Sequence, residues 1–289
     1  MFGEGAGLQD ALPATQLPSR IREGKQPMQR TAQAAAVPAH MTDAEWQTRV
    51  DLAACYRMIA MFGLDDLIYT HISARVPGPE EHFLLNPFGL LYEEVTASNL
   101  VKVDLKGEIV DPGTDPINPA GFVIHSCVHE ARPDLTCVIH THTVAGVAVS
   151  CQEEGLLPMT QTALLYRDLI GYHGYEGLAL NMSEQERLVA DLGADKHILI
   201  LRNHGLLACG RTIPEAFIMC YYVEQACRMQ VAAQAGRGGV GQGLVLPPEE
   251  VQALAHKQAM GGIGQTALGT REFDALKRRL ARQGADYER

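Results

Sequence analysis

The stretch Val138-Ile139-His140-Thr141-His142 places two histidines two residues apart at the end of a β-forming run. Residues two apart on a β-strand point to the same face of the sheet, so His140 and His142 project together. Imidazole nitrogens bind zinc and similar ions, and this spacing suits two ligands of one ion. Taken alone, the pair could equally be two surface or hydrogen-bonded histidines.

A third histidine, His204, follows the apolar segment Ile198–Leu201 and precedes Gly205. A polar side chain at the end of such a strand, beside a glycine turn, is well placed for a site. Three protein ligands leave coordination positions open, as a catalytic metal requires. We therefore predict a divalent-metal site formed by His140, His142 and His204, although His204 by itself could be a turn histidine.

Two acids, Glu93 and Glu94, end the segment Asn-Pro-Phe-Gly-Leu-Leu-Tyr-Glu-Glu at residues 86–94, which follows a predicted strand. Its proline and glycine suggest a loop of defined shape. Either carboxylate could act as a general acid or base, with its pKa adjusted by burial and by a metal. From the spacing alone, two solvated carboxylates are the favoured interpretation.

Other histidines carry weaker signals. His125 and His129 are four residues apart, so they share one face of a predicted helix. The glutamate of the zinc-protease helix motif is absent, so we assign them to the core or to the surroundings of the metal site. No role follows from spacing for His71, His173 or His197.

The whole chain reads as a mixed or antiparallel sheet covered by helices. Capping residues, glycines and prolines delimit the helices, and β-branched runs delimit the strands. The predicted helices span about residues 42–61, 118–131, 143–151, 183–193, 212–236, 248–260 and 270–283, and the predicted strands span 68–75, 82–85, 101–105, 135–141, 197–201 and 206–209.

Length and composition set the class of protein. The 289 residues, 46% of them hydrophobic, fit one domain of roughly 200 to 250 residues with tails. We divide the chain into a flexible tail at 1–40, a domain at 41–236, and a glycine linker with a helical extension at 237–289. No apolar run is long enough for a membrane span, and no signal peptide is evident, so we expect a cytoplasmic protein.

Charge and cysteine content exclude other classes. The net charge of -10, without a Lys/Arg cluster, disfavours binding to nucleic acid or to anionic membranes. The seven cysteines are odd in number and lack C-x-x-C spacing, so we expect reduced and mostly buried thiols.

Taken in order, Glu93, His140-Thr-His142 and Asn203-His204-Gly205 resemble the class II aldolase/adducin family. The resemblance covers about residues 45–235. Further pieces that carry it are Asn86 to Glu93, Arg132-Pro-Asp and His204-Gly-Leu. The segments Ile68-Tyr-Thr-His-Ile-Ser and Pro119-Ala-Gly-Phe look most like the adducin head domain and its bacterial relatives.

The resemblance implies an α/β/α sandwich around a mostly antiparallel, mixed sheet, and a homo-oligomer, often a tetramer. It implies that His140, His142 and His204 hold zinc, with manganese, cobalt or iron also compatible. The glutamate that matches Glu93 is the acid/base group of the family. The implied reaction is an aldol-type carbon–carbon cleavage through a metal-stabilised enediolate, on a small-molecule substrate.

Two departures from the sugar-phosphate aldolases bear on the substrate. Their phosphate loop has a Gly-Asn pair where this chain has Thr70-His71, so a phosphosugar is not implied. Their proton-donating tyrosine has no match in residues 157–162. Tyr166 lies nearby and could substitute, while His71 and His125 could contact substrate or support the metal ligands. Met159, Leu164 and Leu165 could line a pocket or belong to the core.

Two other functions stay open at this point. Three imidazoles suit Fe(II) as well as zinc, so an Fe(II)-dependent oxygenase or decarboxylase acting on a keto or aromatic acid is one alternative. A non-catalytic, adducin-like binding module is the other. The basic tail with which adducin contacts the actin–spectrin skeleton is missing, but all three candidate ligands are present.

Overall fold

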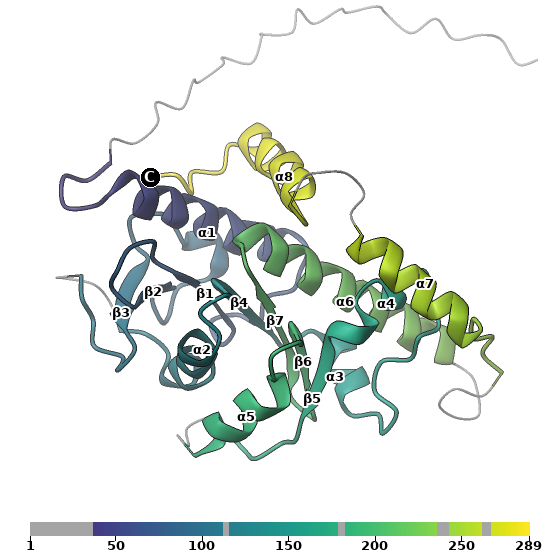
Figure 1. The fold of residues 1–289 in the computed structure, drawn as a ribbon. Helices are drawn as coiled ribbons and strands as arrows, with labels where there is room; N and C mark the ends of the chain where they lie inside the picture. The colour runs from purple at the N-terminus through teal and green to yellow at the C-terminus, as the bar shows by residue number, and fades with distance from the viewer. Residues whose placement is uncertain (1–36, 112–115, 179–182, 236–242, 262–266) are drawn as a thin grey trace, which may run out of the picture. The chain divides into compact units, whose positions relative to one another are not determined.

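One seven-stranded sheet, in the order β3-β2-β1-β4-β7-β6-β5, organises the chain (Figure 1). All neighbouring strands are antiparallel except β5 and β6. The computed structural model describes residues 37–111, 116–178, 183–235, 243–261 and 267–289, within the compact unit Ala34–Arg289. The strands are β1 (His71–Arg75), β2 (His82–Leu85), β3 (Val101–Asp104), β4 (Cys137–Thr141), β5 (Ile170–His173), β6 (Ile198–Leu201) and β7 (Gly205–Gly210).

Helices cover both faces of this sheet, which confirms the expected α/β/α sandwich. They are α1 (Asp43–Met61), α2 (Pro119–Ala131), α3 (Val144–Ser150), α4 (Gln161–Leu165), α5 (Glu184–Leu192), α6 (Ile213–Gln234), α7 (Glu249–Met260) and α8 (Thr270–Gln283), with short 3-10 turns η1 (Tyr92–Glu94) and η2 (Arg167–Leu169). None of the described helices is both long and apolar enough to cross a membrane.

Two hydrophobic cores fill the two interfaces between sheet and helices. On β4, Ile139 joins the core under α1, α6 and α8, whereas its neighbour Val138 joins the core under α2 and α5. Consecutive strand residues point to opposite faces, so both faces of this central strand are apolar. Phe273 and Leu280 of α8 are buried in the first core, which makes this C-terminal helix part of the main unit.

Strand direction brings distant segments to one edge of the sheet. β2, β4, β5 and β6 end at this edge, while β1, β3 and β7 begin there. The residues that follow β4 and β6, the loop after β2 and the first residues of β1 therefore gather at this edge, which we call the histidine edge. It carries His140, His142, His204, Glu93 and His71.

Most predicted elements are confirmed; the differences are the start of the first strand and the short elements η1, α4, η2 and β5, which the sequence did not predict. The first strand begins at His71 rather than Ile68, because Leu67 adopts a left-handed backbone (φ 51°) and Tyr69 is turned to solvent. β5 was not predicted, because Ile170-Gly171-Tyr172-His173 is short and lacks clear alternation. Residues 1–36 of the tail predicted at 1–40, and residues 236–242 of the predicted glycine linker, lie outside the described residues.

Cysteine burial agrees with the expectation from sequence. All seven thiols are free, and six of them are buried, the exposed one being Cys151. Burial raises the pKa of the Cys55 and Cys137 thiols, which keeps them protonated small hydrophobic groups.

A buried tyrosine ties α1 to the sheet. The Tyr56 hydroxyl donates to the backbone carbonyl of Ile72 or to Asn86 Oδ1 (2.8 Å), and it accepts from the Ile72 amide at 2.8 Å. Ile72 lies on β1, and Asn86 begins the loop that leads to Glu93. One hydroxyl thus fixes the spacing between helix, central strand and site loop.

We expect Tyr56→Phe to lower the free energy of unfolding by about 1–3 kcal/mol, because it leaves the buried Ile72 and Asn86 groups without their partner. Urea denaturation measures this difference. Tyr221→Phe is the matched control, since the Tyr221 hydroxyl forms no hydrogen bond with any described residue while its ring packs on Phe62. An equal, small effect in both variants would contradict the structural role of Tyr56.

Candidate metal centre

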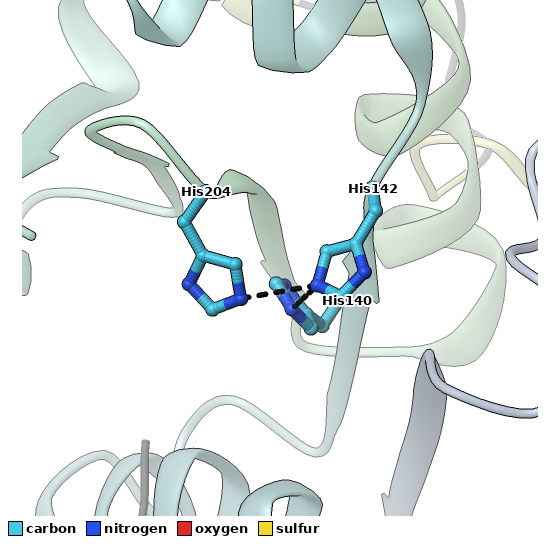
Figure 2. A group of neighbouring side chains, drawn as sticks. All are labelled: His140, His142 and His204. Atoms are coloured by element: carbon cyan, nitrogen blue, oxygen red, sulfur yellow. Dashed lines mark hydrogen bonds between the residues drawn. The ribbon is translucent and has the colours of Figure 1, made fainter. Parts of the chain in front are cut away.

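The three predicted ligands converge at the histidine edge (Figure 2). His140 lies on β4, His142 follows the same strand, and His204 lies in the turn between β6 and β7. The Nε2 atom of His142 is 2.8 Å from that of His140 and 3.0 Å from that of His204. The one nitrogen that each residue offers lies within 4.8 Å of the others. Residues up to 64 positions apart in the sequence therefore converge on one point.

Hydrogen bonds set the orientation of two of these rings. His140 Nδ1–H donates to the carbonyl of Leu206 on β7, at 3.0 Å. His142 Nδ1–H donates to Asp66 Oδ2, also at 3.0 Å. A histidine whose Nδ1 donates in this way presents a lone pair at Nε2, the arrangement found for metal-ligating histidines.

This pattern leaves lone pairs facing each other. If His140 and His142 both carry their proton on Nδ1, neither can donate across the 2.8 Å Nε2–Nε2 contact. Two facing lone pairs repel unless a cation lies among them. The donor set therefore fits a divalent ion held by three neutral imidazoles, with open positions for substrate oxygens.

The local backbone explains the sequence Asn203-His204-Gly205. Asn203 adopts a left-handed conformation (φ 55°), which asparagine tolerates better than most residues. A Cβ at Gly205 would lie 2.3 Å from the carbonyl oxygen of Thr141, so only glycine fits beside β4. The tight turn brings His204 next to the end of the neighbouring strand.

Burial favours the neutral form of His140 and His204. Desolvation lowers the pKa of His204 to about 4, with smaller effects from His142 and His173. Desolvation, followed by the neighbouring histidines, also lowers the pKa of His140. A metal must compete with protons for these nitrogens, so lowered pKa values favour metal binding at neutral pH.

Carboxylates surround the three histidines. Desolvation, with smaller contributions from the charges of Glu93 and Asp66, raises the pKa of Asp65. The Glu93 charge acts on Asp65, the neighbour of Asp66, and also on Arg57. Glu94 Oε2 accepts the Leu91 amide at 2.8 Å and closes the η1 turn. Both glutamates are exposed.

The sequence matches the family Class II Aldolase and Adducin N-terminal domain over residues 50–231. The chain belongs to the class II aldolase/adducin family. A Pseudomonas aeruginosa protein whose name places it in aldolase class 2 is 51% identical over 88% of this chain and 96% of its own length. Mouse alpha-adducin is 43% identical over 82% of this chain, which spans only 33% of that protein.

Solved structures agree with this family assignment. An aldolase II superfamily protein from Pseudomonas syringae has a TM-score of 0.82 and 52% identity, covering 86% of this chain and 98% of its own. An L-fuculose 1-phosphate aldolase from Glaciozyma antarctica has a TM-score of 0.73 and 28% identity, covering 88% of this chain and 97% of its own. The fold is therefore that of class II aldolases.

A hydrogen-bonded chain of buried side chains lies beside the metal centre. His71 Nδ1 contacts His125 Nε2 at 2.8 Å, His125 Nδ1 contacts Ser73 Oγ at 2.6 Å, and Ser73 Oγ contacts His129 Nε2 at 2.7 Å. His71 lies directly opposite His140 across the β1–β4 pair, and their ring centroids are 5.2 Å apart. His71 and His125 thus lie next to the metal centre, while His129 is at the far end of the chain.

Tyr166 is not brought to this site. It precedes η2 and β5, so it lies toward the opposite edge of the sheet, and its side chain is 3% exposed in the main core. Desolvation, followed by Tyr222, Glu272 and Glu215, raises the pKa of its hydroxyl. Leu164 and Leu165 likewise pack in or against the core rather than around the histidines.

Sequence reasoning missed Asp66 and Ser73. Asp66 lies in the connection between the first helix and the first strand. The sequence shows the acidic pair Asp65-Asp66 there, but it does not indicate that Asp66 contacts His142. Ser73 is two residues after His71, so strand periodicity already placed both on one face. A pocket of about 490 Å³, lined by Arg75, Thr136 and Thr212, lies at the opposite edge and not beside the histidines.

We expect Asp66→Ala to weaken divalent-metal binding by about 10- to 100-fold, because His142 loses the carboxylate that fixes its ring. Mass spectrometry of metal per chain and competition with a chromophoric chelator measure this. Asp65→Ala is the matched control: it removes the same charge without removing a ligand's hydrogen bond. His142→Ala gives the reference for a lost ligand. Equal affinities for both aspartate variants would contradict the role of Asp66.

We also expect stability to fall between pH 6.5 and pH 5. The folded-state pKa is lowered to about 3 for His71 and His129, and to about 4 for His204, in each case mainly by burial. The unfolded chain therefore binds more protons than the folded chain in this window, and acidification favours unfolding. Urea midpoints at both pH values measure the effect. In His129→Gln the dependence becomes shallower; greater stability at pH 5 would contradict this prediction.

Proposed function

We propose that this chain is a metal-dependent carbon–carbon lyase of aldol type that acts on a small oxygenated substrate. The observation that carries the proposal is the convergence of His140, His142 and His204, with two of their rings held so that Nε2 lone pairs face one point. This donor set occurs in a chain of the class II aldolase/adducin family. The similarity to a fuculose-phosphate aldolase structure supports the same reading.

A bound divalent ion would supply a Lewis acid that polarises a substrate carbonyl and stabilises the negative charge left on carbon. The chain's own residues would do the rest. Asp66 and the Leu206 carbonyl hold the rings of His142 and His140 in place. Zinc is our first choice of ion, and manganese, cobalt or iron would fit the same imidazoles.

Glu93 is proposed as the group that moves a proton to and from the substrate carbon. It follows Tyr92, whose buried hydroxyl donates to Thr70 Oγ1 at 2.8 Å and so ties the loop to the start of β1. Glu93 is exposed at the histidine edge, where substrate would arrive. The nearby carboxylates of Asp65 and Asp66 disfavour a further negative charge, which argues for a substrate without phosphate.

We expect Glu93→Gln to slow solvent-deuterium exchange into the α-carbons of dihydroxyacetone by about 10²- to 10⁴-fold in zinc-loaded protein, because an amide cannot carry the proton. Proton NMR in D₂O follows the exchange. Glu94→Gln is the matched control and keeps the rate, since Glu94 closes a turn. Equal exchange rates in both variants and the parent protein would remove Glu93 from this role. Iron recovered at one ion per chain, with oxygen uptake, would favour the Fe(II) alternative.

A second candidate function is a binding module of adducin type. Its support is the 43% identity to mouse alpha-adducin over 82% of this chain. Co-sedimentation with actin filaments separates the two: saturable binding together with absence of bound metal would favour the module. Metal binding and α-carbon exchange without sedimentation would favour the lyase.

We further propose a homo-oligomer, with a tetramer as first choice, that contacts its copies near the histidine edge. Large apolar side chains are exposed on the loops of this edge. Val144 follows His142 and is 90% exposed, and Leu178, which follows β5, is 79% exposed. Such side chains are costly to leave in water in a monomer.

A further inference from the structure

A buried chain of polar side chains, formed by His71, His125, Ser73 and His129, lies beside the three candidate ligands. Three imidazoles and one hydroxyl lie in line under α2, where a sheet face normally carries aliphatic side chains. His125 and His129 are fully buried, and His71 is 3% exposed. Stability alone gives no reason to bury so many polar groups, because each must find a partner.

These rings are neutral, so each carries one proton. The described residues offer them no carboxylate, and a buried imidazolium without one would be costly. A neutral imidazole donates from one nitrogen and accepts at the other. The Ser73 hydroxyl contacts only these two rings among the described residues, so its own proton must go to one of them and it accepts from the other. The whole chain is therefore ordered in one of two directions.

The far end of the chain selects the direction. His129 Nδ1 is buried without a hydrogen-bond partner, and so is the Nε of its neighbour Arg75, whose guanidinium donates to the His129 carbonyl. A buried N–H left without a partner costs more than a bare acceptor. The absence of a partner therefore favours a lone pair at Nδ1 of His129.

The remaining protons then follow one from another. His129 Nε2–H donates to Ser73 Oγ, the Ser73 hydroxyl donates to His125 Nδ1, and His125 Nε2–H donates to His71 Nδ1. His71 Nδ1 is thereby an acceptor, and its single proton must lie on Nε2. Because that nitrogen is protonated, His71 cannot serve as a fourth metal ligand, even though its ring lies beside His140.

We propose that His71, whose ring lies beside that of His140, is a neutral hydrogen-bond donor to a substrate oxygen and is fixed in this tautomer by His125, Ser73 and His129. Its Nε2 forms no hydrogen bond with any described residue. The ring lies against the first turn of α2, where a Cβ at Gly121 would come within 2.7 Å of it. The proposal rests on the proposed function, since it assumes that substrate binds at the three ligand histidines.

This assignment specifies the class of substrate. One uncharged N–H suits a carbonyl, carboxylate or hydroxyl oxygen next to the atoms that bind the metal. It does not suit a phosphate dianion, which needs several donors or a cation. The ring of His71 also occupies the first position of β1. We therefore expect an oxygenated acid or ketone rather than a sugar phosphate.

Nitrogen NMR of histidine side chains tests the tautomer directly. In protein labelled with ¹⁵N-histidine at neutral pH, with His71 assigned by its loss in His71→Gln, we expect a protonated Nε2 and an unprotonated Nδ1. The reverse pattern, or a doubly protonated ring, would overturn the proposal. Ser73→Ala cuts the link to His129, so the His71 signals should move toward an average of both tautomers; unchanged signals would show that the chain does not select the tautomer.

Ligand binding tests the donor. A glutamine amide lies close to the position of Nε2, whereas an asparagine amide lies close to that of Nδ1, so the two variants form a matched pair. In Co(II)-loaded protein titrated with oxalate, we expect His71→Asn to weaken binding about tenfold or more and His71→Gln to stay within about threefold. Equal oxalate binding by the parent and both variants would overturn the donor role.

These two experiments test the role of His71 separately from the proposed lyase function. If no Co(II) binds, the metal-dependent function is wrong, yet the NMR experiment still reads the tautomer of His71. If Co(II) binds in all three proteins and only His71→Asn loses oxalate affinity, the ligands are intact and the loss belongs to the donor.

Discussion

The register of β4 between β1 and β7 is the constraint on which the other features depend. It sets His140 opposite His71 on one side and opposite Leu207 on the other, with the Leu206 carbonyl in reach of His140 Nδ1. A slip of one residue would move His140 to the opposite face and bring Val138 and Ile139 into each other's cores. Because both faces of β4 are packed against apolar layers, such a slip is strongly disfavoured. The position of the site is therefore fixed by hydrophobic burial rather than by the polar groups themselves.

The same packing decides the protonation of the site. The rings of His140, His71 and His125 are removed from water, and burial lowers the pKa of each. Neutral imidazoles are what a metal needs as ligands, and they are also what a hydrogen-bonded chain of histidines needs in order to alternate donors and acceptors. Burial of these rings is therefore the common cause of two properties: stability near neutral pH, and neutral imidazoles that can bind a metal. The polar side chains under α2 can be buried because each of them forms at least one hydrogen bond. At the far end of this chain, His129 Nδ1 and Arg75 Nε have no hydrogen-bond partner.

Members of this family share a fold with different uses, as the similarity to both a fuculose-phosphate aldolase and alpha-adducin illustrates. A fold does not establish a function; the side chains placed on it do. In this chain the three candidate ligand histidines lie together at one edge, and Asp66 is hydrogen-bonded to one of them. The position where the sugar-phosphate aldolases are expected to bind phosphate carries Thr70, which is bonded to Tyr92, and His71, which belongs to a buried chain. Both side chains make the edge less suited to a phosphate than a glycine would.

Local sequence determined the elements and the ligands of this protein. Capping residues and apolar periodicity marked most helices and strands, and the two-residue spacing of His140 and His142 set both on one side of a strand, because strand geometry depends only on neighbours in the chain. The turn before β7 was visible in Asn203-His204-Gly205 for the same reason. Tertiary structure alone decided which distant groups meet. It joined Asp66 to His142 across 76 residues, placed Tyr166 toward the opposite edge, and linked His71 to His125 across 54. These contacts arise from strand order and helix packing, which no short stretch of sequence encodes.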